Sequence, residues 1–322
     1  MSKVLGIGNA LVDTMVRLED DNFLKEVSLP KGSMQLVESH DSKNIALKCE
    51  EFEKSKSSGG SAANTIHGLA RLGVDTGYIG KVGKDELGLF FIEDLEKSKI
   101  KPNLLYGESS SGHALAFISP DSERTFATYL GAALELSADD LKDEFFEGYD
   151  YLHIEGYLLQ NHSLLQKALE KAKNKGLKVS LDLASFNVVE DNIDVLKGWV
   201  EDYVDILFAN EEEAKAFTGK DPQDALNELA EKCELAIVKV GKHGSMVKKG
   251  NEVHRIKPIE ANVVDTTGAG DAYAAGFLYG LVKNYSLDKC GEIASILAGK
   301  VIEGTGAKMS EEKWEEVYRL IG

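Results

Sequence analysis

Short apolar runs alternate with amphipathic segments along most of the chain. Helical spacing is clearest at 62–72, where Ala62, Ile66 and Leu69 fall on one face. Because strands separated by helix-length segments pair in parallel through right-handed crossovers, the pattern predicts an α/β fold with a doubly wound, mainly parallel sheet flanked by helices. The predicted strands are 4–7, 78–82, 151–155, 179–183, 206–209 and 236–240, with a hairpin at 246–249 and 253–256. The predicted helices are 41–56, 62–72, 85–98, 163–175, 192–203, 211–218, 223–232, 269–283, 288–303 and 311–320.

Two stretches break this rhythm and carry strand character instead. Residues 14–39 hold β-compatible runs around a short charged stretch, and 112–130 reads as two strands joined by a turn at Pro120 and Asp121. We expect these stretches to pair with each other as a small β-sheet lid on a single domain that spans 1–322. If one face of the lid sheet is bare, a second copy of the chain is a candidate to cover it, which would give a homodimer.

The composition narrows the classes of partner. The net charge of −17 disfavours nucleic acid, and an anionic substrate must be met by a local site. No apolar stretch reaches the ~18 residues that a transmembrane helix needs, and the first residues lack the pattern of a signal peptide. The scattered Cys49, Cys233 and Cys290 fit a reducing compartment. We therefore expect a cytoplasmic protein that acts on a small molecule, without membrane association.

The most informative segment is DTTGAGD, from Asp265 to Asp271, which opens an apolar helix. Gly268 and Gly270 let the backbone bend tightly and leave room for a ligand. The free N–H groups of the first helical turn and the helix dipole form a site for an anion such as the γ-phosphate of ATP. The dipole favours the ionised form of Asp271, which can take a proton from an attacking hydroxyl. We predict that Asp271 is the catalytic base; the alternative is that it only complements the helix terminus.

A second glycine-containing segment, GGSAAN, opens the predicted helix at 62–72. Gly59 and Gly60 permit close approach of the backbone to a ligand. The amide of Asn64 can donate to and accept from vicinal hydroxyls. The segment is therefore a candidate substrate site, and a plain glycine turn before a helix is the alternative.

Polar residues also follow two of the later strands. Asn210 with Glu213 three residues later is a capping box, which alone explains both residues. The pair also stands at the carboxyl end of a predicted parallel strand, where α/β sheets bind ligands. Asn210 is thus a candidate for the phosphates and Glu213 for Mg²⁺, through water. After the next strand, the Gly-x-x-Gly turn of Gly241 and Gly244 can lie along a nucleotide.

The chain resembles the ribokinase-like, PfkB-type carbohydrate kinases in two segments, GGSAANTIHGLARLG and DTTGAGDAYAAGFLYG. They stand in the family's order, and the resemblance covers essentially the whole chain. Three further segments are similar to a bacterial branch usually labelled adenosine kinase-like: GIGNALVD, KGSMQLVE and ERTFATYLGAA. The resemblance implies a ribokinase-like fold with a β-sheet lid, and use of ATP with Mg²⁺.

Roles for individual positions follow from this resemblance. The base and anion hole match Asp271 with Gly268, Ala269 and Gly270, and the substrate positions match Asp13, Gly59, Gly60 and Asn64. The ATP and Mg²⁺ positions match Asn210, Glu213, Gly241 and Gly244, to which we add Lys239 and Ser295 for ATP. Gly306 belongs to a late Gly-Ala pair that, with Asp265 and Thr267, surrounds a monovalent cation such as K⁺ in many members.

We predict an ATP-dependent kinase that phosphorylates a hydroxyl of an adenosine-like nucleoside or a free sugar. A kinase of sugar phosphates, or another carbohydrate kinase of the fructokinase or ribokinase type, is the alternative. Sugar phosphates would need extra cations in the pocket, for which Lys31, Lys56 and Arg124 are the few candidates. A non-catalytic ligand-binding protein would not need Asp271 and its glycine-rich turn. A nicotinamide-dependent dehydrogenase would need a dinucleotide fingerprint that the sequence lacks.

Overall fold

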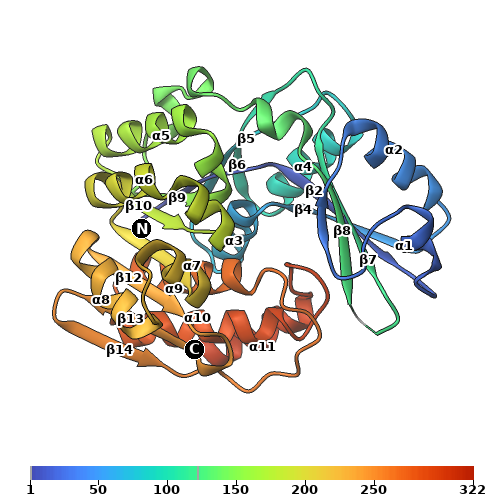
Figure 1. Cartoon of the computed structure of the whole chain (residues 1–322). Coiled ribbons are helices and arrows are strands. Elements are labelled where there is room, and N and C mark those ends of the chain that lie inside the picture. Colours follow the sequence, from blue (N-terminus) through green and yellow to red (C-terminus); the bar gives the residue numbers. More distant parts are fainter. Residues whose placement is uncertain (1, 122) are drawn as a thin grey trace.

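A nine-stranded sheet forms the centre of the computed structural model, which describes residues 2–121 and 123–322 (Figure 1). Its strand order is β14-β13-β12-β11-β10-β9-β1-β5-β6. The strands are β1 (Val4–Ile7), β5 (Thr76–Val82), β6 (Ile100–Tyr106), β9 (Tyr151–Glu155), β10 (Lys178–Asp182), β11 (Ile206–Asn210), β12 (Leu235–Lys239), β13 (Ser245–Lys249) and β14 (Glu252–Ile256). All neighbours from β12 to β6 pair in parallel, and β12, β13 and β14 pair antiparallel. The predicted mainly parallel sheet and the hairpin at its end are confirmed.

Helices cover both faces of this sheet, as predicted. One buried apolar cluster joins the sheet to α3, α4, α9, α10 and α11, and a second joins the other face to α5, α6, α7 and α8. Their bounds are α3 (Ser61–Arg71), α4 (Glu86–Lys97), α5 (His162–Asn174), α6 (Phe186–Tyr203), α7 (Glu211–Thr218), α8 (Pro222–Lys232), α9 (Ala269–Val282), α10 (Leu287–Val301) and α11 (Glu311–Ile321). Short 3-10 turns fill much of 131–160. None of the helices within the described residues combines the length and apolar character needed to cross a bilayer.

A second, five-stranded sheet stands beside the first, in the order β3-β8-β7-β2-β4. Its strands are β2 (Leu11–Arg17), β3 (Met34–Leu36), β4 (Lys54–Gly59), β7 (Gly112–Ile118) and β8 (Arg124–Tyr129). The stretches 14–39 and 112–130 do pair with each other, through β2 with β7 and β3 with β8. Residue 122, inside the predicted hairpin, lies outside the described residues. We call this sheet the lid sheet.

Besides α6, which begins at Phe186 instead of 192, two segments differ from the sequence prediction. The helix expected at 41–56 is α2 (Ser39–Lys48), and residues 54–59 instead form β4, which pairs antiparallel with β2. Thus the lid sheet draws on three stretches rather than two. The second difference is β6, an edge strand that was not predicted because Pro102 interrupts its pattern. Proline is tolerated at a sheet edge, where its missing N–H leaves no partner unpaired.

The two faces of the lid sheet have different surroundings. Leu115 and Phe117 of β7 point to one face, where they pack with α1 (Asn22–Glu26) and α2 on the outer side of the sheet (Figure 1). Because side chains alternate along a strand, Asp13 of β2 belongs to the opposite face. The paired register places Met34 and Leu36 of β3 on that face too, and these two side chains are 55% and 64% exposed.

Candidate active site

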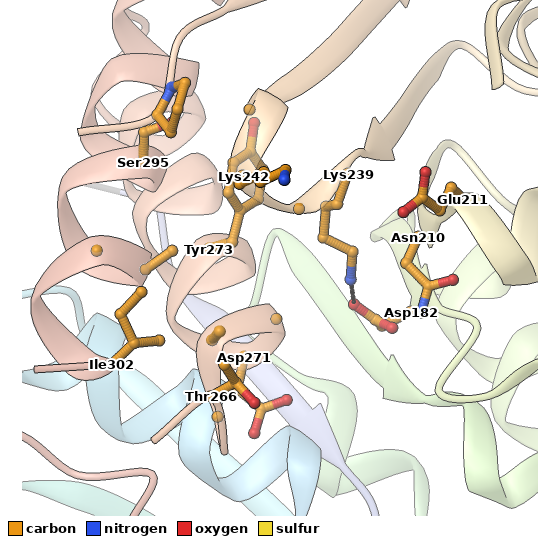
Figure 2. Close-up of a pocket in the computed structure, with 18 of the residues that line it drawn as sticks. Asp182, Asn210, Glu211, Lys239, Lys242, Thr266, Asp271, Tyr273, Ser295 and Ile302 are labelled. Atoms are coloured by element: carbon orange, nitrogen blue, oxygen red, sulfur yellow. Dashed lines mark hydrogen bonds and ion pairs between the residues drawn. The ribbon is translucent and has the colours of Figure 1, made fainter. Parts of the chain in front are cut away.

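A cavity of about 860 Å³ opens at the carboxyl ends of β10, β11 and β12 (Figure 2). The last residues of these strands, Asp182, Asn210 and Lys239, all line it, together with the start of α9. The predicted site residues that line the cavity are Asn210, Glu213, Lys239, Gly241, Gly244, Gly268, Ala269, Gly270, Asp271 and Ser295. Residues far apart in the sequence therefore meet at one edge of the sheet, where α/β folds bind ligands.

Asp271 lies in the first turn of α9 and is held by two side chains of α3. Ser61 Oγ donates to Asp271 Oδ1 at 2.7 Å, and Asn64 Nδ2 donates to Oδ2 at 2.9 Å. Burial raises the pKa of Asp271 to about 6, although both hydrogen bonds act in the opposite direction. The carboxylate is therefore mostly ionised at neutral pH, with a proton affinity higher than that of an exposed aspartate. These properties suit a general base.

The backbone in front of Asp271 turns through Gly268, which is the N-cap of α9 with φ of 73°. A Cβ at Gly268 would lie 2.5 Å from the Cβ of Ala307, so this position needs glycine for both conformation and space. The first-turn N–H groups of α9 have no partners within the helix, although that of Ala269 donates to the carbonyl of Thr266 at 3.2 Å. N–H groups at a helix start can receive an anion, and these lie next to Asp271. A Cβ at Gly270 would be 3.3 Å from Lys239 Nζ, which places that ammonium group beside the same turn.

Lys239 is half-buried and forms an ion pair with Asp182, with Nζ and Oδ2 2.9 Å apart (Figure 2). Burial acts to lower the pKa of Lys239, but the attraction of Asp182 and Glu213 outweighs it and the net shift is upward. The side chain is therefore a permanent cation, next to the carboxylates of Asp182 and Glu213, and Lys242 is a second lysine that lines the cavity. A fixed cation here can meet the negative charge of a phosphate chain.

Asn210 and Glu213 form the predicted capping box at the start of α7. Asn210 Oδ1 accepts from the Glu213 N–H at 2.8 Å, and the two carboxylate oxygens of Glu213 accept from the N–H and Nδ2 of Asn210, both at 2.7 Å. Burial, followed by repulsion from Asp182, raises the pKa of Glu213 to about 7. Each carboxylate oxygen of Glu213 therefore already has one hydrogen-bond donor, and the residue is only 2% exposed.

The far end of the cavity is more apolar. Ala298 and Ile302 of the α10 region line it together with Pro258, and Ser295 is the buried polar residue among them. Gly244 lies where a side chain would collide with the carbonyl of Ile256. An apolar wall with few polar groups is typical of a site for a planar aromatic ring.

The predicted substrate residues lie on the other side of Asp271, next to the lid sheet. A side chain at Gly59 would collide with the carboxylate of Asp13, so Gly59 and Asp13 are in direct contact. Gly60 has φ of 96° and is the N-cap of α3, which brings Asn64 to Asp271. Burial raises the pKa of Asp13 to about 7, and repulsion from Asp271 adds to the shift.

Of the remaining predicted residues, Asp265 contacts both Thr267, in the loop before α9, and Gly306, in the loop after α10. The carboxylate of Asp265 accepts from the N–H of Thr267 at 2.9 Å and from the N–H of Gly306 at 2.6 Å. These groups were assigned to a monovalent cation, but the side chain of Arg124 contacts both Asp265 and Thr267 in this structure.

Several site residues were not predicted. Ser61 is part of the GGSAAN segment, so its contact with Asp271 had a local signal that was not used. Asp182 and Glu155 are the last residues of β10 and β9, and a lone acidic residue at a strand end gives no local signal. Glu155 is buried and accepts from Asn9 and from the N–H of Ala62, which fixes the start of α3.

Lys308 is a further unpredicted residue of the substrate side. Its Nζ donates to Asp94 Oδ2 at 2.6 Å and to Ser58 Oγ at 2.7 Å, and its charge lowers the pKa of Asp13. Because Asp94 pairs with it, Lys308 adds no net charge to this side of the site.

Comparison with known families gives a match over residues 34–314 to the pfkB family of carbohydrate kinases. A protein of Archaeoglobus fulgidus described as an uncharacterized sugar kinase is 31% identical over 247 residues, covering 75% of this chain and 96% of that protein. A 5-dehydro-2-deoxygluconokinase of Geobacillus thermodenitrificans is 30% identical over 286 residues, covering 82% of this chain and 83% of the other.

Solved structures agree with these sequence matches. The crystal structure of adenosine kinase from Sinorhizobium meliloti superposes with a TM-score of 0.87 at 34% identity and covers 99% of both chains. A probable sugar kinase from Rhizobium etli gives a TM-score of 0.87 at 31% identity, covering 99% of this chain and 98% of that one. Adenosine kinase from Schistosoma mansoni with 2-fluoroadenosine shares the fold at 21% identity, with a TM-score of 0.82, covering 96% of this chain and 97% of the other.

Proposed function

Since the chain belongs to the pfkB family of carbohydrate kinases, we propose that it transfers the γ-phosphate of ATP to a hydroxyl of a nucleoside, with Asp271 as the catalytic base. The family and its relatives establish an ATP-dependent kinase for a sugar or a nucleoside. The observation that carries our assignment is the position of Asp271. Its carboxylate lines the large cavity and is hydrogen-bonded to Asn64, which belongs to the substrate segment.

The mechanism follows from this position. ATP lies along the cavity with its adenine near Ser295 and Ile302 and its phosphates toward Lys239. The acceptor hydroxyl lies between Asp13 and Asp271, and Asp271 takes its proton as the oxygen attacks the γ-phosphorus. The first-turn N–H groups of α9 and the Lys239 ammonium stabilise the charge on the transferred group. Asn64 and Ser61 hold the base in place throughout.

Mg²⁺ fits this site as an ion that Glu213 holds through water. Each oxygen of Glu213 already accepts one hydrogen bond from Asn210 and the residue is only 2% exposed, so we place the ion one water molecule away from Glu213 rather than in direct contact. When bound, the ion neutralises phosphate charge and helps to align the phosphate chain.

The lid sheet favours a nucleoside over a simple sugar. Met34 and Leu36 are exposed on the same face of the lid sheet as Asp13, so hydroxyl-binding and apolar groups share one surface. A nucleoside offers both chemistries, because its ribose carries paired hydroxyls and its base is a flat apolar ring. A sugar phosphate is disfavoured because the substrate side is acidic at Asp13 and its half-buried lysine, Lys308, is already paired with Asp94.

A panel of acceptors tests the proposal. Purified protein with ATP and Mg²⁺ is mixed with nucleosides, free sugars or sugar phosphates, and ADP release is followed. We expect the highest kcat/KM with a purine nucleoside. A higher value with fructose 6-phosphate or with a free hexose would contradict the nucleoside assignment and leave the kinase activity in place.

The alternative is that a second copy of the chain, rather than the base of a nucleoside, covers the apolar side chains of Met34 and Leu36. Sedimentation of the purified protein with and without acceptor separates the two cases. A homodimer whose interface covers both residues in the presence of acceptor would contradict their role in binding a base.

We expect Glu213→Gln to raise the Mg²⁺ concentration needed for half-maximal rate by roughly tenfold or more, the usual effect of losing an outer partner of a metal. The amide that replaces the carboxylate still has one oxygen, which can keep one of the two hydrogen bonds from Asn210, so α7 keeps its cap. The measurement is a Mg²⁺ titration of the rate at saturating ATP. An unchanged Mg²⁺ requirement would show that Glu213 is only a helix cap.

The lid sheet is expected to close over the acceptor. It carries Asp13 on β2 and lies outside the main sheet, and a kinase must exclude water from its acceptor site to avoid hydrolysing ATP. We expect slower hydrogen exchange in β2, β7 and β8 when acceptor is bound, and no change in β14 at the distant edge of the main sheet. Equal exchange in the lid strands at saturating acceptor would contradict closure.

A further inference from the structure

Arg124, the first residue of β8 in the lid sheet, reaches the loop in front of α9. Its Nη1 donates to Thr267 Oγ1 at 2.8 Å and forms an ion pair with Asp265 Oδ2. The side chains of Arg124 and Asp265 are only 10% and 3% exposed. The lid sheet is therefore joined to the anion-hole loop by a buried pair of opposite charges.

The hydrogen-bond and ion-pair partners of the Asp265 carboxylate are N–H donors. Its Oδ1 accepts from the Thr267 N–H, and its Oδ2 accepts from the Gly306 N–H and from Arg124. A K⁺ ion needs oxygen ligands, whereas Gly306 presents its N–H and the hydroxyl of Thr267 accepts from the guanidinium. Arg124 stays protonated and would repel a second cation on the same carboxylate oxygen. The groups expected to hold a monovalent cation thus do not fit one in this arrangement.

We propose that Arg124 takes the place of the monovalent cation in this chain: its guanidinium neutralises Asp265 and fixes Thr267, so the anion hole forms without bound K⁺. This inference rests on the proposed function, because it concerns the anion hole at 268–270. Arg124 acts as a positioning residue through Thr267, which directly precedes Gly268. It sets the loop that presents the first N–H groups of α9.

The position of Arg124 also links closure of the lid sheet to formation of the anion hole. A bound ion would neutralise Asp265 whether the lid is open or closed, whereas Arg124 can do so only while β8 lies against the loop. The anion hole is then complete only under a closed lid sheet. This coupling opposes transfer of phosphate to water when no acceptor holds the lid down.

Cation dependence tests the proposal directly. Rates are measured in choline chloride and in KCl at equal ionic strength for the wild type and for Arg124→Met. The wild type is expected to show no saturable response to K⁺. We expect Arg124→Met to lose about 10²-fold in kcat in choline chloride, the cost of a misplaced site, and to regain about tenfold in KCl, or 1.4 kcal/mol, because the freed oxygens can then bind the ion.

Thermal unfolding supplies a readout that does not need activity. KCl is expected to raise the Tm of Arg124→Met above its value in choline chloride, while the wild type and Arg124→Lys, which keep the charge, do not respond to the choice of cation. Lys31→Met is the matched control. It removes a different cation of the lid region, whose ion-pair partners among the described residues are Asp21, Asp121 and Glu123, away from the site.

Saturable activation of the wild type by K⁺ would overturn the proposal. So would wild-type turnover by Arg124→Met, or a loss in that variant that K⁺ relieves neither in rate nor in Tm. If the wild type phosphorylates no acceptor, the proposed function fails, whereas the Tm comparison still decides the role of Arg124.

Discussion

Asp271→Asn is expected to fold normally and to lose roughly 10²–10⁴-fold in kcat, the usual contribution of a general base. The amide has the same shape as the carboxylate and can still accept from Ser61, but it cannot take a proton from the acceptor hydroxyl. The measurement is the steady-state rate at saturating ATP and acceptor, with circular dichroism and thermal unfolding to show that the variant is folded. A folded variant with near wild-type turnover would remove Asp271 from the mechanism.

The pH dependence gives a second view of the same group. The pKa of Asp271 is about 6, and only the ionised form is a base, so kcat/KM should fall about tenfold per unit as the pH drops below that value. Asp13 has a pKa of about 7 and lies on the same side, so the wild-type profile alone does not separate the two.

Ser61→Ala separates them. Its hydrogen bond lowers the pKa of Asp271, so its removal should move the acid limb to higher pH. An acid limb that stays in place in Ser61→Ala would assign that limb to another group, such as Asp13.

The parts of the fold that the sequence predicted are those with strong local patterns. Strands buried on both faces, such as Ile206–Asn210, are nearly continuous apolar runs, and the helices between them show clear periodicity. By contrast, β4 reads KSKSSG and carries no apolar alternation. It is a strand because β2 offers a partner for its backbone, and no local pattern reports that partner. The strand β6 also lacked a clear local pattern, because Pro102 interrupts it.

The candidate site also contains some features with a local sequence signal and others without one. The anion hole is a helix N-terminus, so one short segment contains its glycines, its N–H groups and Asp271. The capping box of Asn210 and Glu213 is equally local. The ion pair of Lys239 with Asp182 and the contact of Arg124 with Thr267 join residues 57 and 143 positions apart. Each depends on how the strands are ordered in the sheets, which the pattern of a single segment does not contain.

Gly268→Ala is expected to reduce kcat by about 10²–10³-fold, the cost of losing a donor from an anion hole. Gly268 has φ of 73°, and an added Cβ would lie 2.5 Å from the Cβ of Ala307. Since Ala307 cannot yield without moving its backbone, the loop must shift, and the first N–H groups of α9 turn away from the γ-phosphate. The measurement is kcat at saturating substrates, together with the free energy of unfolding.

Gly176→Ala provides the matched control for this variant. Gly176 has a nearly identical φ of 76°, it follows α5 at the end of the sheet away from the cavity, and an added Cβ would meet no atom within 4 Å. Both substitutions place alanine in the left-handed region, at a cost of about 1–2 kcal/mol in stability. Only Gly268→Ala should also lose activity. If the two variants retain the same turnover, the turn at Gly268 matters for stability alone, and the charge on the transferred phosphate must be stabilised chiefly by Lys239.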